Sequence, residues 1–155
     1  MKGYLNNPQG TEEAFWDGGW FRSGDVGLFD EEGYLYIVDR IKDMIITGGE
    51  NVYPREVEEA LYTRPEVQEC AVIGLPDPEW GERVTACIIP RPGEPFDRTV
   101  LHAYLKSRLS SFKVPKEYRL VEDFPKSPAG KILKKALREA FSGNPAEGIS
   151  RKRKA

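Results

Sequence analysis

The stretch VQECAVIGLPDPEWGERVTACIIP, residues 67–90, decides the expected fold. Two runs rich in β-branched residues, 67–75 and 83–90, flank the turn Pro76-Asp77-Pro78. This pattern predicts two antiparallel strands joined by a short connection. Cys70 and Cys87 fall within these apolar runs without CxxC spacing, so we expect buried free thiols and no metal site.

Further elements are predicted on both sides of this pair of strands. Upstream, residues 44–47 form a short strand and Pro54 begins a helix. Downstream, Asp97 caps a second helix, residues 116–121 form a strand, and a last helix covers 131–141. Because strands and helices are mixed and the turns suit antiparallel pairing, we predict the α+β class, a small mixed sheet packed with helices.

The first forty residues have the pattern of a helix and a β-hairpin without a core of their own. Thr11 is expected to cap the helix. Residues 20–29 and 34–38 are the predicted strands, and the acidic segment 30–33 is the turn between them.

A charged link, residues 39–43, separates this hairpin from the rest of the chain. We therefore predict two parts, residues 1–41 and 42–142, with the hinge at their junction. Residues 143–155 contain the basic run Arg151-Lys152-Arg153-Lys154, and we expect a disordered, solvated tail there.

Composition narrows the class of protein. The chain has 155 residues, 39% hydrophobic and 31% charged, with a formal net charge of −2. These values fit a globular protein and give no general reason to expect nucleic acid or an anionic membrane as partner. No apolar run approaches the roughly 20 residues needed to span a bilayer, and Met1 leads into polar sequence. We expect a cytoplasmic location.

Three short segments have residues suited to binding or catalysis. Asp25 follows Gly24, and its carboxylate could accept hydrogen bonds from a cis-diol or simply close a turn. Gly48-Gly49-Glu50 either admits a ligand close to the backbone or makes a tight turn. Lys131 follows a glycine turn at the predicted start of the last helix, a placement that opposes the helix dipole and suggests function.

A basic stretch later in the chain has two interpretations. It could bind a nucleotide by phosphate contacts and stacking, or it could be a solvated surface. Its cations are Lys106, Arg108, Lys113, Lys116 and Arg119, interleaved with Phe112 and Tyr118. His102, the single histidine, is expected on the surface of a helix, and a Ser-His-Asp mechanism has no support.

Four motifs, taken in order, resemble the last conserved blocks of the adenylate-forming superfamily, which comprises acyl-CoA synthetases, peptide-synthetase adenylation domains and luciferases. They are Trp20-Phe21-Arg22-Ser23-Gly24-Asp25, Tyr36-Ile37-Val38-Asp39-Arg40-Ile41-Lys42-Asp43, Ile46-Thr47-Gly48-Gly49-Glu50-Asn51-Val52-Tyr53-Pro54 and Pro125-Lys126-Ser127-Pro128-Ala129-Gly130-Lys131. The resemblance extends to about residue 141 and is nearest to acyl-CoA synthetases of fatty or aryl acids.

The resemblance implies a ligase that works in two steps. A carboxylic acid attacks the α-phosphate of ATP with Mg²⁺ to give an acyl-adenylate and pyrophosphate, and the thiol of coenzyme A (CoA) then displaces AMP. By motif, Asp25 holds the ribose hydroxyls, Arg40 reaches the nucleotide and Lys131 bridges carboxylate and phosphate oxygens. Lys42 falls at the hinge about which the small domain rotates between the steps.

The same resemblance implies a surface that faces CoA. The Gly48-Gly49-Glu50 turn lines the channel for the pantetheine arm, and Trp80 lies beside that arm. Phe112 and Lys116 meet the CoA nucleotide as stacking and phosphate partners.

The family's phosphate loop and acyl pocket belong to a large N-terminal domain that these residues do not include. The resemblance therefore implies a mobile C-terminal domain preceded by the last helix and hairpin of the large domain, its partner, which also supplies the Mg²⁺ ligands. We expect this chain alone to be inactive. The alternatives are the lid of a peptide-synthetase adenylation domain and a non-catalytic fragment that binds nucleotide or CoA.

Overall fold

The computed structural model describes residues 1–142, and the predicted basic tail lies outside them. The chain divides into two compact units, an N-terminal unit, Met1–Lys42, and a C-terminal unit that begins at Asp43. Within the described residues, no helix is long and apolar enough to cross a membrane.

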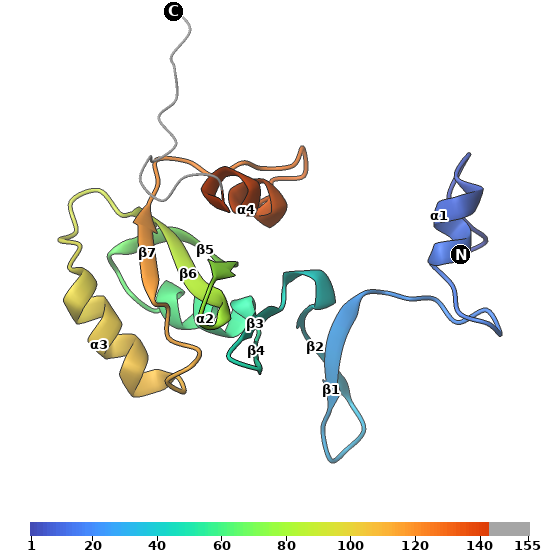
Figure 1. Ribbon diagram of the computed structural model, residues 1–155, viewed down its shortest axis with the longest axis horizontal. Coiled ribbons are helices and arrows are strands. Elements are labelled where there is room, and N and C mark those ends of the chain that lie inside the picture. Colours follow the sequence, from blue (N-terminus) through green and yellow to red (C-terminus); the bar gives the residue numbers. More distant parts are fainter. Residues whose placement is uncertain (143–155) are drawn as a thin grey trace, which may run out of the picture. The chain divides into compact units, whose positions relative to one another are not determined.

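A mixed five-stranded sheet forms the centre of the C-terminal unit (Figure 1). Strand β6 is central: β5 pairs antiparallel along one edge, while β3, near Gly81, and the parallel strand β7 share the other. Strand β4 pairs only with β3. The strands are β3 (Ile45–Thr47), β4 (Glu50–Val52), β5 (Val67–Asp77), β6 (Gly81–Pro90) and β7 (Glu117–Leu120).

Three helices cover the sheet, α2 (Pro54–Tyr62), α3 (Arg98–Arg108) and α4 (Lys134–Ser142). Strand β5 contributes to two cores, because its successive side chains point to opposite faces of the sheet. Val72 packs in the core that includes residues of α2 and α3, whereas Ile73 packs with residues of α4. Burial on both faces accounts for the continuous apolar run of residues 70–75. The predicted α+β class with a small mixed sheet is confirmed.

The predicted thiols and the second helix are also confirmed. Cys70 and Cys87 are buried and unpaired, and burial raises the pKa of each to about 12. Asp97 caps α3, since its carboxylate accepts hydrogen bonds from the N–H groups of Thr99 at 2.7 Å and Val100 at 3.2 Å.

In the C-terminal unit, two predicted boundaries were wrong and one strand was missed. The turn between β5 and β6 is Pro78-Glu79-Trp80, because Pro76 and Asp77 continue β5. Strand β4 was missed, since three residues after Gly49 are too few to give a period-2 signal. Helix α4 begins at Lys134, because residues 126–132 form a turn instead.

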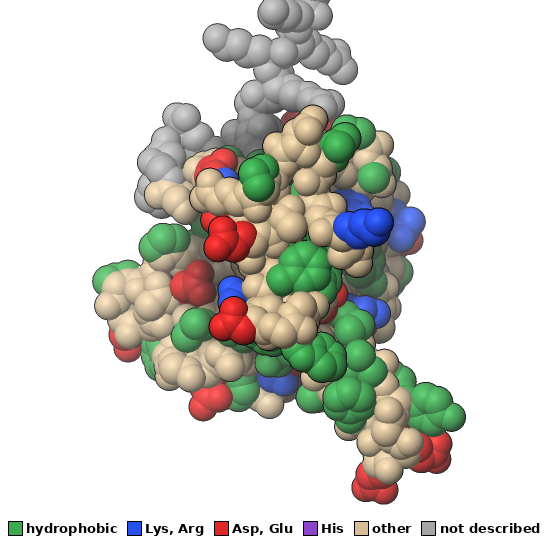
Figure 2. Space-filling model, turned by 90° about the vertical axis from the view of Figure 1, so that its right-hand side faces the viewer, with side chains coloured by type: hydrophobic (Ala, Val, Ile, Leu, Met, Phe, Trp, Pro, Cys, Tyr) green, Lys and Arg blue, Asp and Glu red, His purple; other side chains and the backbone are tan. Residues whose placement is uncertain are grey.

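The N-terminal unit contains α1 (Pro8–Glu13) and a hairpin of β1 (Asp25–Phe29) and β2 (Leu35–Arg40). Asn7 caps α1 through a 2.8 Å bond from Gly10 N–H, so the predicted cap at Thr11 was wrong. Strand β1 is shorter than predicted, because residues 22–24 make no ladder. None of residues 1–42 is buried, and Figure 2 shows hydrophobic side chains along the hairpin with acidic ones at its tip.

Candidate functional site

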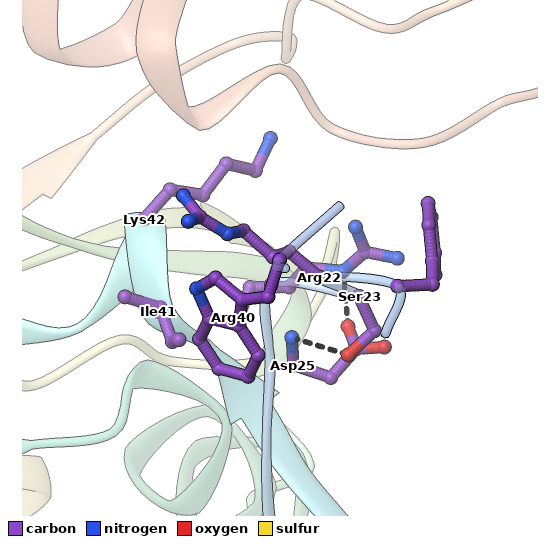
Figure 3. A pocket seen from close by; sticks show the side chains of 9 residues that line it. Arg22, Ser23, Asp25, Arg40, Ile41 and Lys42 are labelled. Atoms are coloured by element: carbon purple, nitrogen blue, oxygen red, sulfur yellow. Dashed lines mark hydrogen bonds and ion pairs between the residues drawn. The ribbon is translucent and has the colours of Figure 1, made fainter. Parts of the chain in front are cut away.

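The first candidate residues meet in a pocket of the N-terminal unit. The hairpin register places Asp25 opposite Arg40, and Arg40 Nε lies 2.8 Å from Asp25 Oδ1. Figure 3 shows these two side chains, with Lys42, around a pocket of about 550 Å³. Its lining residues are Trp16, Phe21, Arg22, Ser23, Gly24, Asp25, Arg40, Ile41 and Lys42.

Local backbone geometry presents Asp25 at the rim of this pocket. Gly24 has φ +72°, a conformation that L side chains rarely adopt, and it precedes β1 directly. Ser23 Oγ accepts a 3.1 Å hydrogen bond from the N–H of Asp25. Asp25 is one-quarter exposed and Arg40 about one-half, so solvent and ligands can reach the ion pair.

Residue 42, the predicted hinge, lies in a one-turn 3-10 helix, Ile41–Asp43. Its neighbour Asp43 belongs to the C-terminal unit, where Arg138 Nη2 lies 3.1 Å from Asp43 Oδ1. The first residue of the C-terminal unit is therefore fixed to α4, and the backbone freedom of a hinge would reside before Asp43.

Lys131 lies at the end of a tight turn, not at a helix start. Gly130, at φ +78°, donates to Ser127 O at 2.8 Å, and the Lys131 N–H contacts Ser127 Oγ at 3.2 Å. The interpretation from the helix dipole was therefore wrong, because α4 begins three residues later. The exposed Lys131 side chain is instead presented by a turn.

Two ion pairs hold this turn and α4 on the domain. Lys126 Nζ lies 2.8 Å from Glu69 Oε1 on β5. Lys134 Nζ lies 2.7 Å from Glu58 Oε1 on α2, and both side chains are about five-sixths buried. The same Glu58 oxygen accepts a 2.7 Å bond from Val72 N–H, so the base of α4 is joined to both α2 and the sheet.

Three of the six predicted CoA residues meet at one edge of the sheet. The Gly48 N–H donates to Trp80 O at 2.8 Å, and the indole ring covers Gly48 so closely that a Cβ there would lie 2.7 Å from Cε3. Lys116 Nζ lies 3.5 Å from the centroid of the Trp80 ring, a cation–π distance. We call Gly48, Trp80 and Lys116 the indole cluster.

Gly49 and Glu50, from the adjoining turn, are exposed. Phe112 is only partly buried but packs against the main core. Trp80 keeps 42% of its surface exposed, although Gly48 and Lys116 both lie against its ring.

Two cations of the basic stretch in the sequence pair with carboxylates in the structure. Lys113 Nζ pairs with Glu56 at 2.8 Å. Arg119 points inward to Glu117 at 2.6 Å and to the Phe141 ring, with 11% of its side chain exposed. Lys113 and Arg119 are therefore engaged by carboxylates, whereas Lys106, Arg108 and Lys116 remain exposed.

Sequence reasoning missed the pocket-lining position of five polar residues. Arg22 and Ser23 belong to the pocket at Asp25. Arg98, Thr99 and His102 line a second pocket beside Lys116. His102 is half-buried and bonded to Tyr118 at 3.0 Å, not simply on the surface. The helical spacing of Arg98 and His102, i and i+4, was the available signal.

Residues 1–142 contain no group of three or more histidine, cysteine, aspartate or glutamate side chains able to hold a metal ion.

Comparison with known proteins identifies the C-terminal unit. Residues 56–131 match the family model described as "AMP-binding enzyme C-terminal domain". The chain carries an AMP-binding enzyme C-terminal domain. The match extends from α2 to Lys131, and so covers most of the sheet, the indole residues Trp80 and Lys116, and the turn.

Relatives of this AMP-binding enzyme domain include acyl-CoA ligases. The chain is 50% identical over 141 residues to feruloyl-CoA synthase of an Amycolatopsis species, covering 91% of this chain and 28% of that protein. It is 50% identical over 142 residues to the long-chain-fatty-acid–CoA ligase FadD13 of Mycobacterium tuberculosis, covering 92% and 28%.

A solved structure agrees in fold beyond the family segment. ATP-bound MatB from Rhodopseudomonas palustris matches with a TM-score of 0.83 and 42% identity, over 91% of this chain and 28% of that chain. The chain thus spans little more than a quarter of the length of the relatives it matches.

Proposed function

We propose that this AMP-binding enzyme C-terminal domain serves an ATP-dependent acyl-CoA synthetase of the cytoplasm. The reaction joins a carboxylic acid to CoA through an acyl-adenylate and releases pyrophosphate, then AMP. The observation that carries the proposal is the 50% identity to two CoA ligases over nine-tenths of the chain.

In the first step, a carboxylate oxygen of the acid forms a bond to the α-phosphorus of ATP while the bond to pyrophosphate breaks. Lys131 supplies a compact positive charge to the carboxylate and phosphate oxygens, where negative charge accumulates. Its place on an exposed, well-anchored turn supports this role. Asp25 accepts hydrogen bonds from the ribose hydroxyls, and Arg40 both orients Asp25 and reaches the nucleotide.

In the second step, the CoA sulfur bonds to the acyl carbon and the bond to AMP breaks. The domain first rotates about Lys42, so that the indole cluster and the Gly49-Glu50 turn face the reacting carbonyl. The pantetheine arm passes over the glycines beside Trp80, and the nucleotide end of CoA lies toward Lys116 and Phe112.

The remaining components come from a large N-terminal domain, the partner of this chain. It supplies the Mg²⁺ ligands, the phosphate loop and the acyl pocket, and the chain alone is inactive. A carrier-protein thiol is the alternative acceptor. The exposed Trp80 with Lys116 over its ring favours CoA, because a nucleotide offers both a flat base and phosphates.

A chimaera tests the proposal directly. The segment of feruloyl-CoA synthase that aligns with this chain would be replaced by this chain, and ATP–pyrophosphate exchange and thioester formation would be measured with ferulate. The truncated synthase without any C-terminal segment is the blank. Restored formation of both products supports the proposal, whereas a folded chimaera that is as inactive as the blank refutes it.

The same chimaera tests Lys131. We expect Lys131→Ala to slow adenylation by about 10²–10³-fold, a loss of a few kcal/mol of transition-state stabilisation, and to spare thioester formation from supplied acyl-adenylate. Lys135→Ala is the matched control, because Lys135 is 84% exposed and contacts Glu139 only loosely, at 3.8 Å. Equal slowing of both half-reactions by Lys131→Ala would contradict this assignment.

A further inference from the structure

A largely buried ion pair joins the first residue of α4 to α2. Lys134 Nζ lies 2.7 Å from Glu58 Oε1, and each side chain is only 16% exposed. The carboxylate is itself fixed, because Glu58 Oε1 also accepts a 2.7 Å hydrogen bond from the Val72 N–H on β5. One turn further along α2, the Tyr62 hydroxyl accepts a 3.2 Å hydrogen bond from the Cys70 N–H on the same strand. Helix α2 is therefore bonded to β5 at two points, and Glu58 is one of them.

Lys131 lies in a turn whose own hydrogen bonds are local. The Gly130 N–H donates to Ser127 O and the Ser127 N–H donates to Lys131 O, both at 2.8 Å. These bonds fix the shape of the turn but do not attach it to the domain. Attachment comes from the packing of Ile132 against the core beneath α4 and from an ion pair on each side of the turn.

The ion pair after the turn is the better shielded of the two. Lys126 and Glu69, the pair before the turn, are 37% and 26% exposed, against 16% for both Lys134 and Glu58. Coulomb attraction is stronger where water is excluded, so the second pair holds its geometry more firmly. A buried ion pair often contributes less net stability than apolar side chains of the same volume, so stability alone does not account for this one.

We propose that Glu58 is a positioning residue for adenylation. Through Lys134 it holds the turn that presents the Lys131 ammonium group to the carboxylate and phosphate oxygens. Stabilisation of a transition state depends on charges that are already in place, and a displacement of about 1 Å can slow a reaction about a hundredfold. This inference rests on the proposed function, because that function gives Lys131 its role.

Two variants separate positioning from stability. Glu58→Gln keeps an oxygen that can accept from the Val72 N–H but leaves Lys134 without its carboxylate, which weakens the fold. The double variant Glu58→Gln/Lys134→Met removes both charges, so no buried charge is left unpaired. Glu59→Gln is the matched control, because Glu59 is the next residue on α2 and its ion pair with Arg55 is exposed.

Hydrogen exchange of the full chain measures whether Glu58 holds the turn. We expect the double variant to speed exchange of the Gly130 and Leu133 amides about tenfold, because these N–H groups donate within the turn and directly after it. Amides of β6 should exchange as slowly as in the parent chain, and Glu59→Gln should change neither set. Unchanged exchange at the turn in the double variant would overturn the proposal.

The chimaera measures the catalytic effect. We expect both Glu58 variants to slow adenylation by about 10–100-fold and to spare thioester formation from supplied acyl-adenylate. In a Lys131→Ala background, Glu58→Gln should slow adenylation by less than about a further twofold, because a residue that acts through another has no separate effect once the other is removed.

The remaining outcomes distinguish the two proposals. Recovery of adenylation in the double variant, or equal slowing of both half-reactions, would make the ion pair structural only. Full additivity with Lys131→Ala would mean that Glu58 does not act through Lys131. Each of these results overturns the positioning role and leaves the proposed function standing. A parent chimaera as inactive as the blank contradicts the proposed function, and this role with it.

Discussion

At the scale of single residues, the Gly48-Gly49 turn shows two glycines required for different reasons. Both have positive φ, +58° and +84°. A Cβ on Gly48 would lie 2.7 Å from the Trp80 ring, so Gly48 is needed for contact within the fold. A Cβ on Gly49 would meet nothing within 4 Å, so packing alone does not explain the second glycine. A ligand that passes over this turn requires open space, and the space around Gly49 is open.

This difference leads to a prediction for Gly49→Leu in the chimaera. We expect adenylation to stay within about threefold of the parent and thioester formation to fall by at least about a hundredfold, because the leucine side chain occupies the path of the pantetheine arm. Separate assays of the two half-reactions provide the measurement.

Gly93→Leu is the matched control for backbone strain. Gly93 has φ +87° and open space around its Cβ position, but it lies in the loop before α3. Each substitution should cost roughly 1–3 kcal/mol of stability from its strained φ. If Gly49→Leu and Gly93→Leu reduce both half-reactions alike, Gly49 serves only the backbone.

Some site residues could be predicted from the sequence because each depends on a local pattern. The chain turns at Gly24, just before Asp25, and at Gly130, just before Lys131. In both places the glycine in the sequence is the local signal that predicts the turn. Arg98 and His102 could not be found this way. Their pocket exists only because β7 runs parallel to β6 and brings Lys116 to α3, a contact between residues 14 to 18 positions apart.

At the scale of elements, β7 is attached to the sheet by charge as well as by its ladder. Glu117 accepts from Arg83 Nε on β6 at 2.7 Å and from Arg119 Nε at 2.6 Å. Burial by itself would raise the pKa of Glu117, but the bonds and charges of the two arginines outweigh it and lower that pKa. The folded state therefore favours ionised Glu117 more than the unfolded state does.

The sign of this shift gives a pH-dependent prediction. Because the pKa of Glu117 is lower in the folded state, its ionisation stabilises the folded state fully at pH values above the ordinary carboxyl pKa. This stabilisation is lost as the pH falls through the lowered pKa of the folded state. We expect Glu117→Gln to lower the free energy of unfolding by about 1–2 kcal/mol at pH 7 and by much less below about pH 4. Urea denaturation at both pH values measures the difference.

The exposed Glu94 provides the comparison, since Glu94→Gln should shift stability by less than about 0.5 kcal/mol at either pH. If Glu117→Gln lowered the free energy of unfolding by the same amount from pH 7 to pH 3, packing and not charge would hold β7.

Element types were easier to predict than element ends. Strands β5 and β6 are long and apolar, so their existence follows from composition. The start of α4 did not follow, because Ile132 and Leu133 continue a helical apolar spacing although the Lys126–Ile132 bridge extends the chain there. Tertiary hydrogen bonds outweighed local pattern at that point.

At the scale of the whole molecule, the two units differ in how they are stabilised. The C-terminal unit contains two apolar cores with side chains such as Leu61, Ile73 and Leu101 fully buried. The N-terminal unit has no buried residue, and Phe29 and Leu28 on its hairpin are 73% and 63% exposed. A two-stranded hairpin is marginally stable in water unless its apolar face is covered. The units should therefore unfold at different free energies.

Hydrogen exchange of the full chain at low micromolar concentration, with its monomeric state established by light scattering, measures this difference. We expect amides of β5 and β6 to require global unfolding for exchange and to remain protected for hours. Amides of residues 20–38 should exchange within seconds to minutes, because local opening of the hairpin exposes almost no new apolar surface. Slow exchange of residues 20–38 that appears only at higher concentration would mean that the hairpin pairs with a second copy through its strand edges. Equally slow exchange in a demonstrated monomer would mean that residues 1–42 are stabilised within this chain, and the division near Lys42 would then not separate two levels of stability.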